Sequence, residues 1–168
     1  MRRVLGAAEG AVWGGLIFPE RLPDIATALL VDGADSPELR NLAGLDVGPF
    51  DPRDARDVFV RLLDEQSMPT ESISSRLSSA AHLLAVAANS RALSVRNALR
   101  RFQRLAIAAD YPDDPEVMTL YGLEDEWVGG WGRTHMDIER ELADIFRAMA
   151  ARAPAPPDYL VQALVESV

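Results

Sequence analysis

The longest run of regularly spaced apolar residues in the chain lies in residues 70–110, TESISSRLSSAAHLLAVAANSRALSVRNALRRFQRLAIAAD. Two runs of apolar residues recur in it every three or four positions, which is the spacing of one face of an α-helix. The first run is Ile73, Leu77, Ala80, Leu84 and Ala88, and the second is Val95, Leu99, Phe102 and Ala106. Because Asn89 and Ser90 interrupt the pattern, the stretch predicts a helical hairpin on which the other helices pack.

Helix start signals recur along the rest of the chain. Three segments pair an N-cap residue with a proline at the first helical position, namely residues 36–37, 51–52 and 114–115. We expect the third of these helices to end at Gly122 and the glycine-rich residues 127–132 to be irregular. Thr134 and Asp137 match a capping box that starts a further helix. These signals predict an all-α fold, an irregular bundle of seven to eight helices in one domain over residues 1–168.

Composition limits the classes of function. The 168 residues are 48% hydrophobic and 26% charged, which is typical of a globular domain. The net charge of −9 disfavours broad nucleic-acid binding, because DNA and RNA phosphates would be repelled by most of the surface. Arg2 and Arg3 precede an apolar run, as in a secretory signal, but Glu9 interrupts that run. We therefore expect a short N-terminal helix, no membrane span and a cytoplasmic protein.

Two residue types do not occur in the sequence. The chain has no cysteine, which excludes thiolate catalysis, disulfides and cysteine-based metal sites. It also has no lysine, since all 17 basic residues are arginines, and this excludes Schiff-base chemistry and a Walker A lysine. With two histidines and no Glu-x-x-His pair, the sequence predicts no metal site, and it indicates no cofactor.

Residues 35–44, DSPELRNLAG, resemble a segment found in a group of small actinobacterial helical proteins. In that group a D-S-P-x-L-R-x-L-A-G motif follows a short amphipathic helix, and residues 22–29 would form that helix here. The acidic segment before the last long helix, residues 125–127, is also similar. The resemblance implies a small helical domain and assigns no activity. In physical terms, Ser36 caps a helix, Pro37 fixes its first φ angle and Gly44 ends it.

Arg76 and His82 have the Arg-x5-His spacing of HEPN-type ribonucleases, which are also small all-α domains. In such enzymes the arginine stabilises phosphate charge and the histidine transfers a proton. Six residues advance about 600° around a helix, so these two side chains point about 120° apart. An RNA-cleaving enzyme that uses Arg76 and His82 is therefore an alternative function, and solvated residues on a helix surface are the simpler interpretation.

Four arginines of the second hairpin arm form a basic stripe: Arg96, Arg100, Arg101 and Arg104. An acidic run without any basic residue, residues 110–126, follows a few positions later. We expect this run to fold back and pair with the arginines. Two alternatives stay open, an acidic protein partner and a nucleic acid bound through the stripe.

The loop between the acidic run and the last long helix has the composition of a binding site. It combines two tryptophans with glycines and charged residues, and the candidate contacts are Asp125, Glu126, Trp127, Trp131, Arg133 and His135. Tryptophan is enriched in interface hot spots, and glycine lets a partner approach the backbone. In the competing interpretation both tryptophans plug the core.

The sequence favours a non-enzymatic, acidic helical protein that binds another macromolecule, most concretely an inhibitor or immunity protein against a basic partner. The partner is expected to be a protein rather than a nucleic acid. Besides the ribonuclease, a bundle that binds a small molecule between Trp127 and Trp131 is an alternative. The oligomeric state does not follow from the sequence.

Overall fold

The computed structural model describes residues 1–45, 51–68 and 71–167, and its regular structure over these residues is entirely helical. The helices are α1 (Arg2–Trp13), α2 (Leu22–Val31), α3 (Pro37–Gly44), α4 (Pro52–Glu65), α5 (Ile73–Asn89), α6 (Val95–Ala108), α7 (Pro115–Gly129), α8 (His135–Ala150) and α9 (Asp158–Glu166), with a 3-10 turn at Pro19–Arg21. The all-α prediction is confirmed, with nine α-helices in the described part of the chain where seven to eight were expected.

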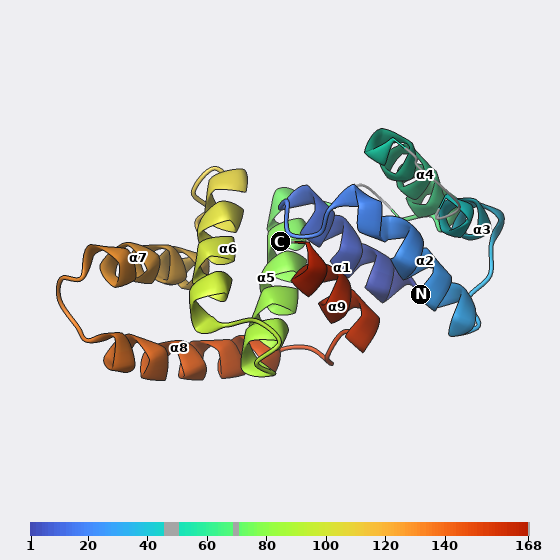
Figure 1. Cartoon of the computed structure of the whole chain (residues 1–168). Helices are drawn as coiled ribbons and strands as arrows, with labels where there is room; N and C mark the ends of the chain where they lie inside the picture. The colour runs from blue at the N-terminus through green and yellow to red at the C-terminus, as the bar shows by residue number, and fades with distance from the viewer. Residues whose placement is uncertain (46–50, 69–70, 168) are drawn as a thin grey trace.

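Helix α5 lies at the centre of the molecule (Figure 1). Helices α6, α7 and α8 lie on one side of it, and α1, α2 and α9 lie on the other, with α3 and α4 beyond them. Helix α5 packs against α1, α6 and α8, so Leu83 and Leu84 are fully buried. The predicted hairpin corresponds to α5 and α6, although Thr70 lies outside the described residues. Ile73 was expected to face inward but is 58% exposed, because the buried face of α5 begins one turn later at Leu77.

The close contact between α1 and α5 explains Gly10 and the acidic residue of the N-terminal helix. A Cβ atom at Gly10 would lie 2.6 Å from the backbone oxygen of Arg76, so only glycine permits this approach. Beside it, the Arg76 guanidinium donates two hydrogen bonds to Glu9 Oε1, at 3.0 and 2.7 Å. Glu9, the acidic residue that interrupts the apolar run, therefore forms an ion pair with Arg76 of α5.

Side-chain caps start six of the helices, at Ser36, Asp51, Ser72, Ser94, Asp114 and Thr134. The expected end of α7 at Gly122 is wrong, because the helix continues to Gly129 and ends at the left-handed Gly130. Leu120 and Leu123 are buried on either side of Gly122 and hold the helix on the core through that position. Residues 127–132 were predicted to be irregular, but residues 127–129 thus belong to the last turn of α7.

Arg101 is buried and does not belong to an exposed stripe. Its guanidinium donates hydrogen bonds to the backbone oxygens of Leu164 at 2.7 Å, Ser167 at 3.1 Å and Leu16 at 3.4 Å. Burial, and secondarily the nearby Arg104, lower the pKa of Arg101. The carbonyl groups at the end of α9 carry partial negative charge, which suits a cation. Arg101 therefore joins the segment after α1 and the end of α9 to α6.

Candidate partner-binding site

The connection between α7 and α8 exposes three large apolar side chains within nine residues. Val128 is 64% exposed, Trp131 63% and Met136 66%. We call residues 125–141, which include the last turn of α7 and the first turns of α8, the α7–α8 tip. The interpretation in which both tryptophans plug the core is wrong for Trp131, whereas Trp127 packs partly against the core.

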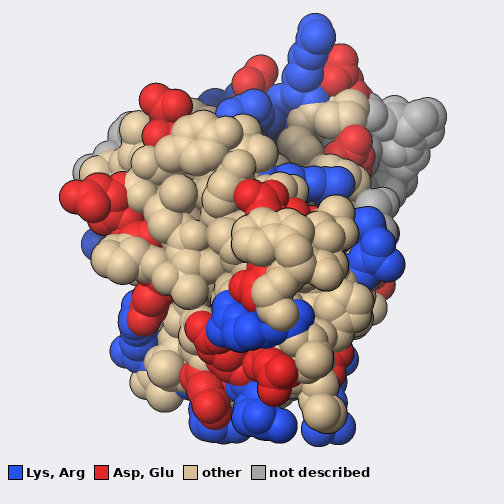
Figure 2. Space-filling model, turned by 90° about the vertical axis from the view of Figure 1, so that its left-hand side faces the viewer, with Lys and Arg blue, Asp and Glu red and all other residues tan. Residues whose placement is uncertain are grey.

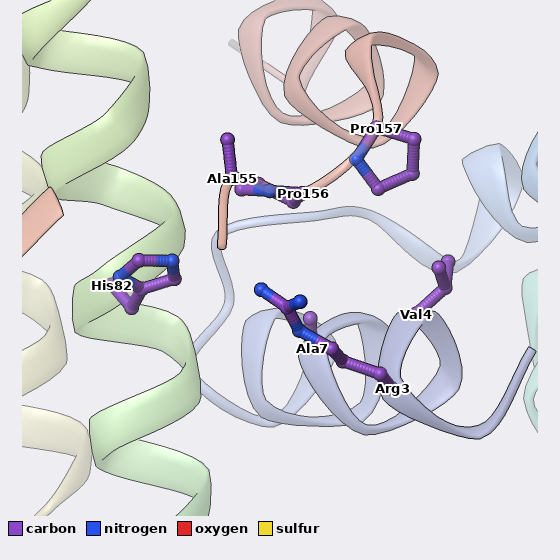
Figure 3. A pocket seen from close by; sticks show the side chains of 7 residues that line it. All are labelled: Arg3, Val4, Ala7, His82, Ala155, Pro156 and Pro157. Atoms are coloured by element: carbon purple, nitrogen blue, oxygen red, sulfur yellow. The ribbon is translucent and has the colours of Figure 1, made fainter. Parts of the chain in front are cut away.

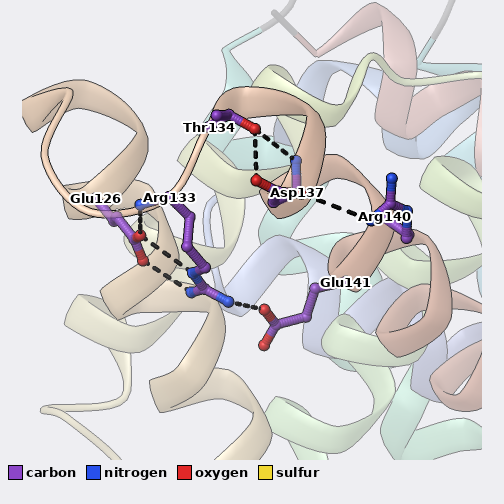
Figure 4. Close-up of polar contacts among 6 residues, drawn as sticks. All are labelled: Glu126, Arg133, Thr134, Asp137, Arg140 and Glu141. Atoms are coloured by element: carbon purple, nitrogen blue, oxygen red, sulfur yellow. Dashed lines mark hydrogen bonds and ion pairs between the residues drawn. The ribbon is translucent and has the colours of Figure 1, made fainter.

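A cluster of charged groups holds the two helices of the tip together (Figure 4). The Arg133 guanidinium donates to both carboxylate oxygens of Glu126, and the Arg133 backbone N–H donates to Glu126 Oε1 at 2.8 Å. A third guanidinium nitrogen of Arg133 donates to Glu141 of α8. Arg133 thus bridges the end of α7 and the second turn of α8, and it fixes the path of the connection.

The groups of this cluster shift one another's pKa values. The hydrogen bonds from Arg133, first from its side chain and then from its backbone, lower the pKa of Glu126 to about 2. The Glu126 and Glu141 carboxylates raise the pKa of Arg133. At the start of α8, the Thr134 hydroxyl donates to Asp137 at 2.6 Å, and this bond is the main cause of the lowered pKa of Asp137. With their lowered pKa values, Glu126 and Asp137 stay ionised at neutral pH.

Aromatic stacking and backbone geometry further restrict the tip. The His135 ring lies on Trp127 with centroids 4.3 Å apart and planes 9° from parallel. The His135 Nε2 atom is also 3.2 Å from the Trp127 backbone oxygen. The Trp131 indole lies directly against Gly129, where a Cβ atom would come within 2.1 Å of the indole nitrogen. Trp131 is therefore exposed to solvent while its indole packs against Gly129.

The tip is acidic as well as apolar. Residues 125–141 carry five acidic and two basic side chains. Asp125 and Glu139 are exposed, and they take part in no ion pair within the described part of the chain. Figure 2, which faces this end of the molecule, shows acidic and basic side chains alternating around broad uncharged areas. A partner that covers the tip would meet three exposed apolar side chains and more acidic than basic residues.

The expected pairing of the basic stripe with residues 110–126 is not found among the described residues. Acidic residues of that run have other partners, since Glu116 pairs with Arg152, Glu126 with Arg133, and Glu124 accepts a hydrogen bond from Gln103. Of the stripe, Arg101 is buried, whereas Arg96, Arg100 and Arg104 are exposed in one row, four residues apart. Helix α7 packs on α6 with its apolar face and leaves this row open to solvent.

Arg76 and His82 do not share a pocket in the described structure. Arg76 binds Glu9 and lines a hollow between α1, α4 and α5. His82 lies more than a turn further along α5, where its Nδ1 atom is 3.2 Å from the Met149 backbone oxygen. Two other pockets meet at His82, and neither includes Arg76. The arrangement that an RNA-cleaving pair would need is therefore not formed within one chain.

Comparison of this chain with protein-family models, with curated proteins and with solved structures finds no match. The resemblance of residues 35–44 to the actinobacterial group thus stays a prediction. Within the described residues, no three histidine or acidic side chains are grouped to hold a metal ion. None of the described helices is long and apolar enough to cross a bilayer.

The structure adds residues that the sequence interpretation missed. Val128 and Met136 are exposed apolar side chains of the tip, as Trp131 is, and Glu141 completes the ion cluster. For Val128 and Met136 the sequence did contain a usable signal of exposure. Both are apolar residues close to the glycines and the capping box that separate two predicted helices. The contact of Arg133 with Glu141, eight positions away, requires the turn between α7 and α8 and has no signature in the sequence.

Proposed function

We propose that this chain is a non-enzymatic interaction protein that docks a basic protein partner through the α7–α8 tip. The observation that carries this proposal is Trp131, a 63% exposed tryptophan on a connection fixed at both ends by Arg133. A rigid aromatic anchor loses little conformational entropy on binding, so more of its buried area contributes to affinity.

The charge of the tip supports a basic partner. Five of the seven charged residues in 125–141 are acidic, and the whole chain carries a net charge of −9. Such a surface accelerates association with a basic protein and repels polyanions. An inhibitor or immunity protein against a basic enzyme is the most concrete form of this function. A cytoplasmic location remains an expectation from the sequence.

The experiment is capture of partners from the native cells with three tagged forms: the wild type, Trp131→Ala, and Ile107→Ala as a matched control. Ile107 is 53% exposed on α6, so its substitution removes a comparable exposed side chain outside the tip. Loss of a tryptophan hot spot weakens binding by at least about 30-fold. We expect one basic protein to be captured by the wild type and by Ile107→Ala, and to be lost with Trp131→Ala.

Salt gives a second, independent criterion. Since the tip carries more acidic than basic residues, capture of the partner should weaken as salt concentration rises. A partner retained equally by Trp131→Ala, or bound equally at low and high salt, would show that the tip is not the docking site.

A further inference from the structure

Helix α6 carries three arginines in one exposed row, Arg96, Arg100 and Arg104, which we call the α6 arginine row. Successive members are four positions apart, so they lie about 6 Å apart along the helix axis and the row is about 12 Å long. None of the three forms an ion pair within residues 1–45, 51–68 and 71–167. By contrast, the pocket between α1, α5 and residues 155–157 is lined by seven side chains, of which only Arg3 is an arginine (Figure 3). The row therefore gathers unneutralised positive charge on a chain whose net charge is −9.

The row opposes the stability of the helix that carries it. Like charges four positions apart on a helix repel each other, and α6 contains no acidic residue that would compensate. Arg96 also lies in the first turn, where the helix dipole disfavours a cation. On α8, by comparison, Arg140 and Arg147 each pair with an acidic residue three positions earlier. Because departures from such local rules are expected mainly at functional sites, the uncompensated row indicates a binding role.

The helix beneath the row is fixed by its buried face. Leu99, Phe102 and Leu105 are buried in the core. Between them, the buried Arg101 donates hydrogen bonds to backbone oxygens at the end of α9. The spacing of the three exposed arginines along α6 is therefore set before a partner arrives, and this reduces the entropy cost of binding.

We infer from these observations that the α6 arginine row docks an acidic segment of a partner protein. The segment is an extended peptide with carboxylates at three alternate positions. Alternate side chains of an extended peptide lie on one side and are about 6.4–6.8 Å apart, which is close to the spacing of the row. Each guanidinium can donate two parallel hydrogen bonds to one carboxylate.

A short acidic peptide fits this surface better than a nucleic acid does. Helix α7, which packs on α6, carries four acidic residues and no basic residue. A peptide that covers only the row avoids these charges, whereas the continuous phosphate backbone of a longer nucleic acid would approach them. The row lies outside the α7–α8 tip, so this inference does not depend on the proposed basic partner.

The test is fluorescence anisotropy of labelled peptides titrated with the whole protein at an ionic strength of about 0.15 M. The probe has three glutamates separated by single threonines. One control peptide has its three glutamates adjacent, which places only two carboxylates on one side of an extended chain, and the other has glutamines in their place. We expect the probe to bind with a Kd below about 1 mM and both control peptides to bind at least about tenfold more weakly.

Arg100→Glu reverses the charge at the centre of the row without endangering the helix. The introduced carboxylate lies four positions from both Arg96 and Arg104, so the midpoint of thermal unfolding should not fall. Binding of the probe should weaken by about tenfold or more. Arg56→Glu makes the same charge change at an exposed position of α4 and should bind within about twofold of the wild type.

A single-stranded tetranucleotide, which has three phosphates, tests the nucleic-acid alternative under the same conditions. The inference is overturned if the probe does not bind at about 1 mM protein, or if either control peptide binds equally well. It is also overturned if Arg100→Glu retains wild-type affinity, if Arg56→Glu weakens binding as much, or if the tetranucleotide binds more tightly than the probe.

Discussion

Arg133 holds Glu126 by two side-chain hydrogen bonds, from Nε to Oε1 at 3.1 Å and from Nη2 to Oε2 at 2.8 Å. Such a bidentate pair fixes the relative orientation of the two groups as well as their distance. The pair joins the last turn of α7 to the residue before the cap of α8, and it sets the position of Trp131 between them.

The first prediction concerns pH. Because the folded-state pKa of Glu126 is about 2 and its ordinary value is 4.5, the stability that the pair contributes is fully present above pH 4.5. It is lost as the pH falls from 4.5 towards 2. The difference in free energy of unfolding between the wild type and Glu126→Gln should therefore shrink over this window. Urea unfolding at several pH values measures it, and a difference that stays constant from pH 6 to pH 2 would contradict the ion pair.

The second prediction concerns the exposure of Trp131. The chain has three tryptophans, and of these Trp13 and Trp127 are partly buried. Acrylamide should quench mainly the Trp131 fluorescence, so Trp131→Phe should lower the overall quenching constant clearly. Trp127→Phe serves as the comparison and should change that constant less. If the two variants behave alike, the Trp131 indole is not presented to solvent.

The third prediction compares two adjacent arginines of α6. Arg101→Met removes a donor from three buried carbonyl groups, of which only that of Leu164 keeps another, the Ser167 backbone N–H, and should destabilise the protein by about 2–4 kcal/mol. Arg100→Met changes an exposed side chain and should alter stability by less than about 0.5 kcal/mol. Chemical unfolding of both variants gives the two values. Equal effects would mean that Arg101 does not join the segment after α1 and the end of α9 to α6.

The fourth prediction compares two helical glycines with opposite expected signs. Gly10→Ala would place a Cβ atom 2.6 Å from the Arg76 backbone oxygen and should destabilise the protein by about 1–3 kcal/mol. Gly122→Ala meets nothing within 4 Å in the middle of α7 and should stabilise it by about 0.5–1 kcal/mol. Thermal unfolding distinguishes the two. A stabilising Gly10→Ala would show that α1 does not approach α5 so closely.

Local signals in the sequence located four of the nine helix starts in the described residues. Ser36, Asp51, Asp114 and Thr134 each cap a helix through a hydrogen bond within the next three residues, so short sequence segments contain the information. Gly122 was misinterpreted because a mid-helix glycine and a helix-ending glycine look alike until the packing of the neighbouring leucines is known.

The errors in predicting the surroundings of Arg76 and Arg101 have a common cause. Glu9 and Arg76 are 67 residues apart, and Arg101 binds Leu164 at a separation of 63 residues. Helical spacing places such arginines on a polar face, but it does not reveal which distant segment covers that face. The basic stripe was therefore predicted as four equivalent residues, of which the structure buries Arg101.

The most direct test of the proposed docking site is photo-crosslinking in the native cells. A benzophenone amino acid is placed at position 136 of the tip, which keeps Trp131 in place, and, separately, at position 107 of α6, since the native residues at both positions are more than half exposed. The proposal predicts one dominant crosslinked protein, with a basic surface, from position 136 and none of it from position 107. No crosslinked protein at position 136, or the same products from both positions, would contradict docking through the α7–α8 tip.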